Sequence, residues 1–137
     1  MNNDIINSLN VERSEASKSH IMVIGVGGAG GNAVNHMFHL GIKDVDFMVC
    51  NTDQQALDIS PVELKIRLGE DGLGAGNDPA VGRRAAITSL DMVKQMFENY
   101  STKMVFITAG MGGGTGTGAS PVIAKAAREM GILTVGI

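Results

Sequence analysis

The chain has 137 residues, of which 44% are hydrophobic and 18% charged, and its formal net charge is −3. These totals predict one domain with a hydrophobic core. The chain carries no excess of basic residues, which argues against a nucleic-acid partner. The single cysteine, Cys50, excludes an internal disulfide, and no apolar stretch reaches the ~18 residues of a membrane span, so we expect a cytoplasmic protein without membrane insertion.

The first half of the chain predicts two strands and two helices after a polar beginning. Residues 1–18 are rich in Asn, Ser and Glu without a sustained period, so we expect a flexible tail ahead of one domain over residues 19–137. An apolar run over 20–24 predicts a buried strand, and a glycine loop over 25–31 follows it. The next predicted elements are a helix over 32–40, a strand over 46–50, a polar turn over 51–53 and a short helix to Leu57.

The second half continues the alternation of strands and helices. Residues 62–68 predict a third strand near a sheet edge, and a second glycine-rich loop covers 69–77. Asp78-Pro79 predicts the start of a helix to about Asn99, because Asp caps a helix and Pro suits its first turn. The apolar stripe of that helix is Ala86, Leu90, Val93 and Phe97. The last predicted elements are a strand over 104–108, a glycine loop over 110–118, a helix over 119–130 and a strand over 133–137.

The order of these elements predicts an α/β fold. Strands that read as continuous apolar runs and alternate with helices are typical of a parallel sheet covered on both faces, a three-layer Rossmann-like arrangement. In the common strand order 3-2-1-4-5, the loops after strands 1 and 4 meet at the point where the order reverses, and these are the loops richest in glycine here. The chain stops inside an apolar strand, so we expect a domain truncated after the fifth strand.

Two glycine loops between a strand and a helix predict phosphate binding. Glycine lets backbone N–H groups at a helix N-terminus come close to a phosphate, where the helix dipole also favours negative charge. Gly25, Gly27 and Gly30 fit the pattern G-x-G-x-x-G, and the third loop is glycine or threonine everywhere except at Met111. The alternatives without a ligand are a tight turn that packs a helix on a strand for the first loop and a flexible linker for the third. Neither loop contains Lys or Arg, so we expect backbone amides and a Mg²⁺ ion to balance the phosphate charge.

Several motifs in order give the chain a family resemblance over about residues 20–137. They are Val23-Ile24-Gly25-Val26-Gly27-Gly28, Asn51-Thr52-Asp53-Gln54-Gln55-Ala56-Leu57, Gly72-Leu73-Gly74-Ala75-Gly76, Ala109-Gly110-Met111-Gly112-Gly113-Gly114-Thr115-Gly116-Thr117-Gly118 and Gly131-Ile132-Leu133-Thr134-Val135. Together they resemble the tubulin/FtsZ GTPase family in its bacterial cell-division form.

The resemblance implies a protein that binds GTP and GDP, with Mg²⁺ accompanying GTP. It implies head-to-tail self-polymerisation into the division ring at mid-cell, with GTP hydrolysed at the interface between subunits. The catalytic carboxylates of this family come from the C-terminal part of a neighbouring subunit, and a C-terminal tail recruits division-ring partners. We therefore expect this chain to be the N-terminal GTP-binding part, to contain no catalytic residue, and to hydrolyse little by itself.

Site residues follow from the resemblance, position by position. Phosphate contacts are implied for Gly28, Ala29, Gly30, Gly31 and Asn32, and the main phosphate loop is Gly112, Gly113, Gly114, Thr115 and Gly116. Asn51 and Asp53 match a second nucleotide loop, while Gly74, Ala75, Gly76 and Asn77 match the loop that senses the γ-phosphate. The chain departs from the family at Ala29, often Gly, in a shortened segment 68–72, and at Asn77-Asp78-Pro79.

Two other functions fit parts of the pattern. An NAD-dependent Rossmann oxidoreductase would use the same G-x-G-x-x-G and place Asp53 near a ribose. A second phosphate loop after the fourth strand counts against it, because a dinucleotide needs only one. A nucleotide-binding assembly module without catalysis is the third class. His36 and His39 share a helix face without a third ligand, so we interpret them as surface residues and predict no metal site.

Overall fold

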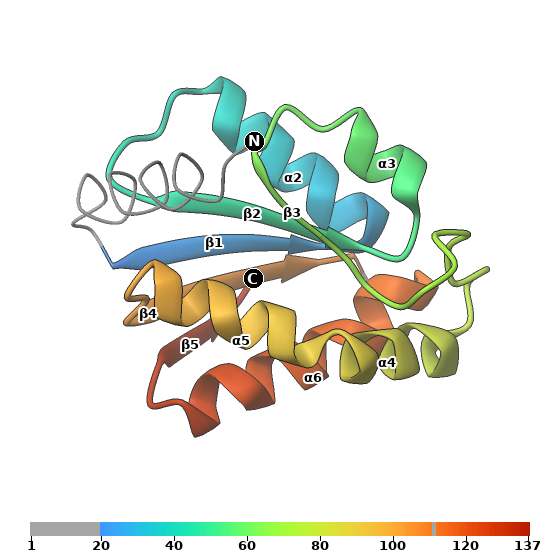
Figure 1. The fold of residues 1–137 in the computed structure, drawn as a ribbon. Helices are drawn as coiled ribbons and strands as arrows, with labels where there is room; N and C mark the ends of the chain where they lie inside the picture. Colours follow the sequence, from blue (N-terminus) through green and yellow to red (C-terminus); the bar gives the residue numbers. More distant parts are fainter. Residues whose placement is uncertain (1–19, 111) are drawn as a thin grey trace, which may run out of the picture.

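A five-stranded parallel sheet organises the computed structural model, which describes residues 20–110 and 112–137. The strand order is β3-β2-β1-β4-β5, so the predicted order is confirmed, with β3 at an edge (Figure 1). The predicted tail over residues 1–18 lies outside the described residues. The strands are β1 (Ile21–Val26), β2 (Asp46–Asn51), β3 (Leu64–Arg67), β4 (Met104–Ala109) and β5 (Leu133–Gly136).

Helices cover both faces of the sheet, which confirms the three-layer prediction. Figure 1 shows α2 (Gly27–His39) and α3 (Gln54–Asp58) on one face, opposite α4 (Pro79–Thr88), α5 (Leu90–Asn99) and α6 (Gly114–Glu129). The core is accordingly divided in two. Val23 packs with Val34 of α2 on one side, while Met22 and Ile24 pack with Ile123 of α6 on the other. Because both faces are buried, the central strands β1, β2 and β4 are mostly apolar, whereas edge strand β3 alternates, with Lys65 and Arg67 exposed.

Two glycine segments predicted as loops are helical over most of their length. The helix after β1 begins at Gly27 rather than at residue 32, and α6 begins at Gly114 rather than at residue 119. Glycine has a low helix propensity, which is why the sequence predicted loops. Tertiary packing reverses that preference, because a Cβ at Gly30 would meet the Thr108 carbonyl oxygen and one at Gly118 would meet the Pro79 carbonyl oxygen. The predicted helix starts were therefore wrong.

The predicted helix over 78–99 is two helices that meet at Ser89. The Ser89 hydroxyl accepts a hydrogen bond from the Gly69 N–H at 3.0 Å and donates to the Arg67 carbonyl at 3.3 Å. These bonds attach the break to the end of β3 and to the start of the second glycine loop. Of the predicted stripe, Ala86, Val93 and Phe97 are buried and Leu90 is half-buried.

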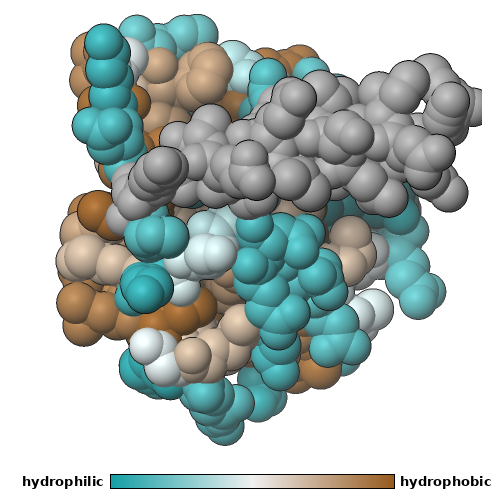
Figure 2. Space-filling model, turned by 60° about the vertical axis from the view of Figure 1, so that its left-hand side comes forward, coloured by the Kyte–Doolittle hydropathy of each residue, from teal (hydrophilic) through white to brown (hydrophobic). Residues whose placement is uncertain are grey.

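The end of the sheet where the strands begin comes forward in Figure 2. Hydrophilic and hydrophobic surfaces lie side by side there. Exposed large hydrophobic residues near this end include Leu40 after α2 and Leu133 at the start of β5. Within residues 20–110 and 112–137, no helix is both long and apolar enough to cross a membrane.

Candidate functional site

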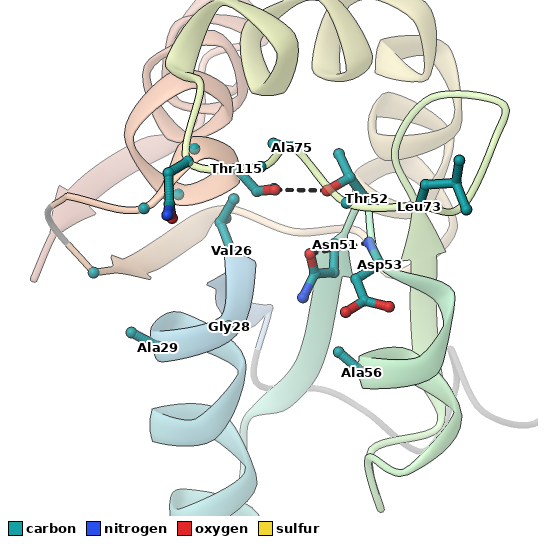
Figure 3. Close-up of a pocket in the computed structure, with 17 residues that line it drawn as sticks. Val26, Gly28, Ala29, Asn51, Thr52, Asp53, Ala56, Leu73, Ala75 and Thr115 are labelled. Atoms are coloured by element: carbon teal, nitrogen blue, oxygen red, sulfur yellow. Dashed lines mark hydrogen bonds between the residues drawn. The ribbon is translucent and has the colours of Figure 1, made fainter.

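A cavity of about 430 Å³ lies at the opposite end, where the strands finish. Figure 3 shows that the ends of β1 and β2, the loop over 69–77 and the first turn of α6 surround it. The lining residues are Val26, Gly28, Ala29, Asn51, Thr52, Asp53, Ala56, Leu73, Gly74, Ala75, Gly76, Asn77, Gly110, Gly113, Gly114, Thr115 and Gly116.

The sheet order explains why a crevice opens at this edge. From β1 the chain passes to α2 on one face, and from the neighbouring β4 it passes to α6 on the other face. Connections that leave adjacent parallel strands in opposite directions separate there, and ligands of open α/β sheets bind in the gap beyond the strand ends. The glycine segments after β1 and β4 therefore face one space, as the sequence predicted.

The two helices that enter the cavity begin without side-chain caps. Val26 precedes α2 and Gly113 precedes α6, and neither supplies a side-chain hydrogen bond to the first turn. By contrast, Asp53 caps α3 through the Gln55 N–H, and Asp78 caps α4 through the Ala80 N–H, both at 3.0 Å. The first N–H groups of a helix have no partner within it. Uncapped starts at α2 and α6 leave such donors beside the cavity, where an anion would be favoured.

The occurrence of glycine at the positions that line the site has two different physical explanations. A Cβ at Gly114 would lie 2.7 Å from the Asp78 nitrogen, and one at Gly116 would lie 3.0 Å from the Gly110 oxygen, so packing explains both. A Cβ at Gly28 or Gly113 would meet nothing within 4 Å, and φ is not positive at either residue. Neither backbone strain nor crowding requires glycine there. Close approach of a ligand to the backbone is the physical reason that remains.

Three polar residues at the end of β2 face the cavity (Figure 3). The Asn51 side-chain oxygen accepts from the Asp53 N–H at 3.2 Å, which orients the chain as it leaves the strand. The Thr52 and Thr115 hydroxyl oxygens lie 2.7 Å apart in a buried hydrogen bond. This bond joins the end of β2 to the first turn of α6.

The loop over residues 69–77 forms the rim of the cavity. Its backbone has positive φ at Gly72, Gly74, Gly76 and Asn77, a conformation that suits glycine and asparagine. The Gln54 N–H donates to the Gly72 carbonyl at 3.0 Å, which ties the rim to α3. At the rim, the Leu73 side chain is 84% exposed and points away from the core.

Comparison with known proteins identifies the family. The family described as "Tubulin/FtsZ family, GTPase domain" matches residues 20–137. The chain belongs to the tubulin/FtsZ family.

Relatives and solved structures agree with this assignment. The domain is 58% identical over 120 residues to a cell division protein FtsZ of Porphyromonas gingivalis, covering 85% of this chain and 26% of the relative. An empty FtsZ dimer from M. jannaschii is 37% identical with a TM-score of 0.82, covering 99% of this chain and 39% of that one. CetZ2 from Haloferax volcanii, a GTPγS-bound protofilament, is 29% identical with a TM-score of 0.73, covering 85% of this chain and 39% of that one. The chain therefore spans about a quarter of the length of the curated relatives it matches.

The tubulin/FtsZ cavity carries little charge of its own. Among the described residues that line it, Asp53 is the only ionisable side chain. Cys50 is buried in β2 directly before Asn51, and desolvation raises the pKa of its thiol to about 12, so the thiol stays neutral. His36 and His39 are exposed, and among the described residues no three His, Cys, Asp or Glu side chains lie together as a metal-binding group would need.

The structure brings together most of the residues predicted for the site. Those that line the cavity are Gly28, Ala29, Asn51, Asp53, Gly74, Ala75, Gly76, Asn77, Gly113, Gly114, Thr115 and Gly116. Gly31 and Asn32 instead line a smaller adjoining cavity of about 180 Å³. Gly30 and Gly112 line neither cavity. Gly30 packs against the backbone of β4, and Gly112 donates to the Thr117 hydroxyl at 3.2 Å.

Five lining residues were not predicted, namely Val26, Thr52, Ala56, Leu73 and Gly110. Thr52 could have been predicted from the sequence, because it stands between two predicted site residues at the end of a strand. Val26, Ala56 and Leu73 are apolar residues in matched motifs, and only their tertiary positions bring them to the cavity.

Proposed function

We propose that this tubulin/FtsZ domain binds GTP and GDP, with the phosphates in the 430 Å³ cavity. The observation that carries the proposal is the convergence of two uncapped helix N-termini on glycines that packing does not require. Backbone N–H groups at such positions recognise phosphate without basic side chains. The GTPγS-bound state of the CetZ2 relative supports a guanine nucleotide as the ligand.

The smaller cavity suits the nucleoside end of the same ligand. It adjoins the larger one and shares Gly28, Asn51 and Ala56 with it. Amide side chains of Asn32 and Asn35 line it, and such groups can both donate to and accept from a base or a ribose. We therefore place Gly31 and Asn32 at the nucleoside rather than at the phosphates.

Mg²⁺ would balance the nucleotide charge, because no basic side chain is among the described lining residues. The Asn51 and Asp53 side chains offer oxygen atoms on one side of the cavity, and oxygen ligands are what Mg²⁺ prefers. An Asp53 carboxylate close to phosphates would repel them without such a cation. Asp53→Asn should therefore remove most of the Mg²⁺ dependence of GTP affinity, while the helix cap survives because Asn caps as well as Asp. An unchanged Mg²⁺ titration would contradict this placement.

The whole protein, by extension, would polymerise head to tail and hydrolyse GTP between subunits in bacterial cell division. The names of the relatives, a cell division protein and an FtsZ dimer, and the CetZ2 protofilament support this. The exposed rim at Leu73 offers apolar surface for a neighbour over the nucleotide. This domain would hold the nucleotide, and the neighbour would supply the carboxylates that activate water. The NAD-dependent oxidoreductase alternative gains no support from the family match.

The test is a titration of the purified chain with a fluorescent GDP analogue, followed by competition with GTP, ATP and NAD. Displacement by GTP, with ATP and NAD much weaker, is the expected result. Equal displacement by GTP and ATP would mean that the phosphate site works without selecting the base. Preferential displacement by NAD, or no binding of the analogue at all, would refute the proposed function of this chain.

A further inference from the structure

A pair of threonine hydroxyls links the two walls of the cavity. Thr52 follows β2, whereas Thr115 is the second residue of α6, and 63 positions separate them in the sequence. Their oxygen atoms lie 2.7 Å apart, and the residues are only 3% and 7% exposed. Both side chains line the cavity, as Figure 3 shows. The pair therefore lies inside the proposed phosphate site.

The number of protons in the pair limits what it can do. Each hydroxyl has one O–H to donate and can accept two hydrogen bonds. If Thr52 donates to Thr115, the Thr115 O–H is free to donate to a ligand. If the direction is reversed, the free O–H belongs to Thr52.

The position of α6 favours one of the two directions once an anion is bound. Thr115 lies beside Gly114 and Gly116 in the uncapped first turn, where the helix dipole concentrates positive potential. An anion held by those amides lies next to the Thr115 hydroxyl, which then donates to it. The Thr115 oxygen is left to accept, and Thr52 is the hydroxyl at 2.7 Å that can donate.

We propose that Thr52 is a positioning residue for nucleotide binding, which donates to the Thr115 oxygen and so turns the Thr115 O–H toward a phosphate. The inference rests on the proposed function, because it needs an anion at the start of α6. Thr52 itself makes no phosphate contact in this arrangement. Its effect on affinity must therefore pass entirely through Thr115.

A double-mutant cycle on the whole chain tests this, with the fluorescent GDP analogue as the probe. Thr52→Val keeps the side-chain shape and removes the donor, and we expect a dissociation constant about 3- to 10-fold higher. Thr115→Val removes a hydrogen bond to a charged group, and we expect a loss of about 10-fold or more. The double variant should equal Thr115→Val alone, since Thr52 has nothing left to orient.

Three comparisons separate a loss of Thr115 orientation from a general loss of folding. Thr52→Ser keeps the hydroxyl and should bind like the wild type, which also tests the idea if valine is not tolerated. Thr102→Val is the matched control: Thr102 is buried, lies outside both cavities, and its hydroxyl has no partner among the described residues. Its affinity should not change. Melting curves without ligand establish that each variant is folded at the assay temperature.

The outcomes are distinguishable from failure of the proposed function. Additive penalties, a Thr52→Val penalty larger than that of Thr115→Val, or weak binding by a folded Thr52→Ser would overturn the positioning role. So would wild-type affinity in folded Thr52→Val. In each of those cases the wild-type chain still binds the analogue, and the proposed function stands. If the wild-type chain does not bind it, both the proposed function and this inference fail.

Discussion

Replacing Gly28 with alanine should raise the stability of the domain and lower its affinity for GDP. Gly28 is the second residue of α2, its φ is not positive, and an added Cβ meets no atom within 4 Å. Alanine is a better helix former than glycine, by about 0.5–1 kcal/mol for a position near a helix end. For a chain of this size, 1 kcal/mol raises the melting temperature by about 3–5 °C.

The expected loss of affinity follows from the same geometry. A phosphate oxygen that accepts from a backbone N–H lies about 2.9 Å from the nitrogen. A carbon atom must keep about 3.5 Å or more from its neighbours, so a methyl group at Gly28 displaces the phosphate from that N–H. Losing one hydrogen bond to a charged group costs about 1.5–3 kcal/mol, which is about a 10- to 100-fold higher dissociation constant.

Urea denaturation and titration with the fluorescent GDP analogue measure the two effects separately. Gly136→Ala is the matched control, because an added Cβ there also meets nothing and the residue lies in β5, outside both cavities. It should leave affinity unchanged. The reasoning is refuted if Gly28→Ala binds GDP as tightly as the wild type, and the packing argument is refuted if the variant is less stable.

Three further predictions follow from burial and packing. Gly118→Ala should lower the free energy of unfolding by about 1–3 kcal/mol or more in urea titrations, because the new Cβ collides with the Pro79 carbonyl and lies 2.7 Å from the Arg83 nitrogen. Burial raises the pKa of the Cys50 thiol from 9.0 to about 12, so the folded state binds the proton more tightly than the unfolded state. The contribution of the protonated Cys50 thiol to the free energy of unfolding is therefore present below pH 9 and is lost between about pH 9 and about pH 12. Denaturation at several pH values should show the free energy of unfolding falling over this range, and Cys50→Val should reduce that fall. Thr102→Val should raise the melting temperature, because it removes a buried hydroxyl with no partner among the described residues, worth about 1 kcal/mol.

The strand pattern and the two glycine segments were enough to predict the sheet and the place of the site. Most strands are short apolar runs and β3 alternates, and these local signals predicted all five strands. Their order was predicted from the arrangement common to folds that alternate strands and helices. Asp78 and Pro79 predicted the start of α4 from a local signal too, since a cap acts within one turn. What the sequence missed is the break at Ser89, because the bonds that cause it go to Arg67 and Gly69 some twenty positions away.

By itself, the sequence determined the alternation of elements, the burial of both sheet faces and the family motifs, because these depend on the order of residue types along the chain. The tertiary structure decided which glycines pack and which leave space for a ligand: Gly30 and Gly28 look alike in the sequence, yet only Gly30 touches the backbone of β4. It also decided that Thr52 meets Thr115. Both facts depend on contacts between segments far apart in the chain, and the spacing of residues does not encode distances across a sheet.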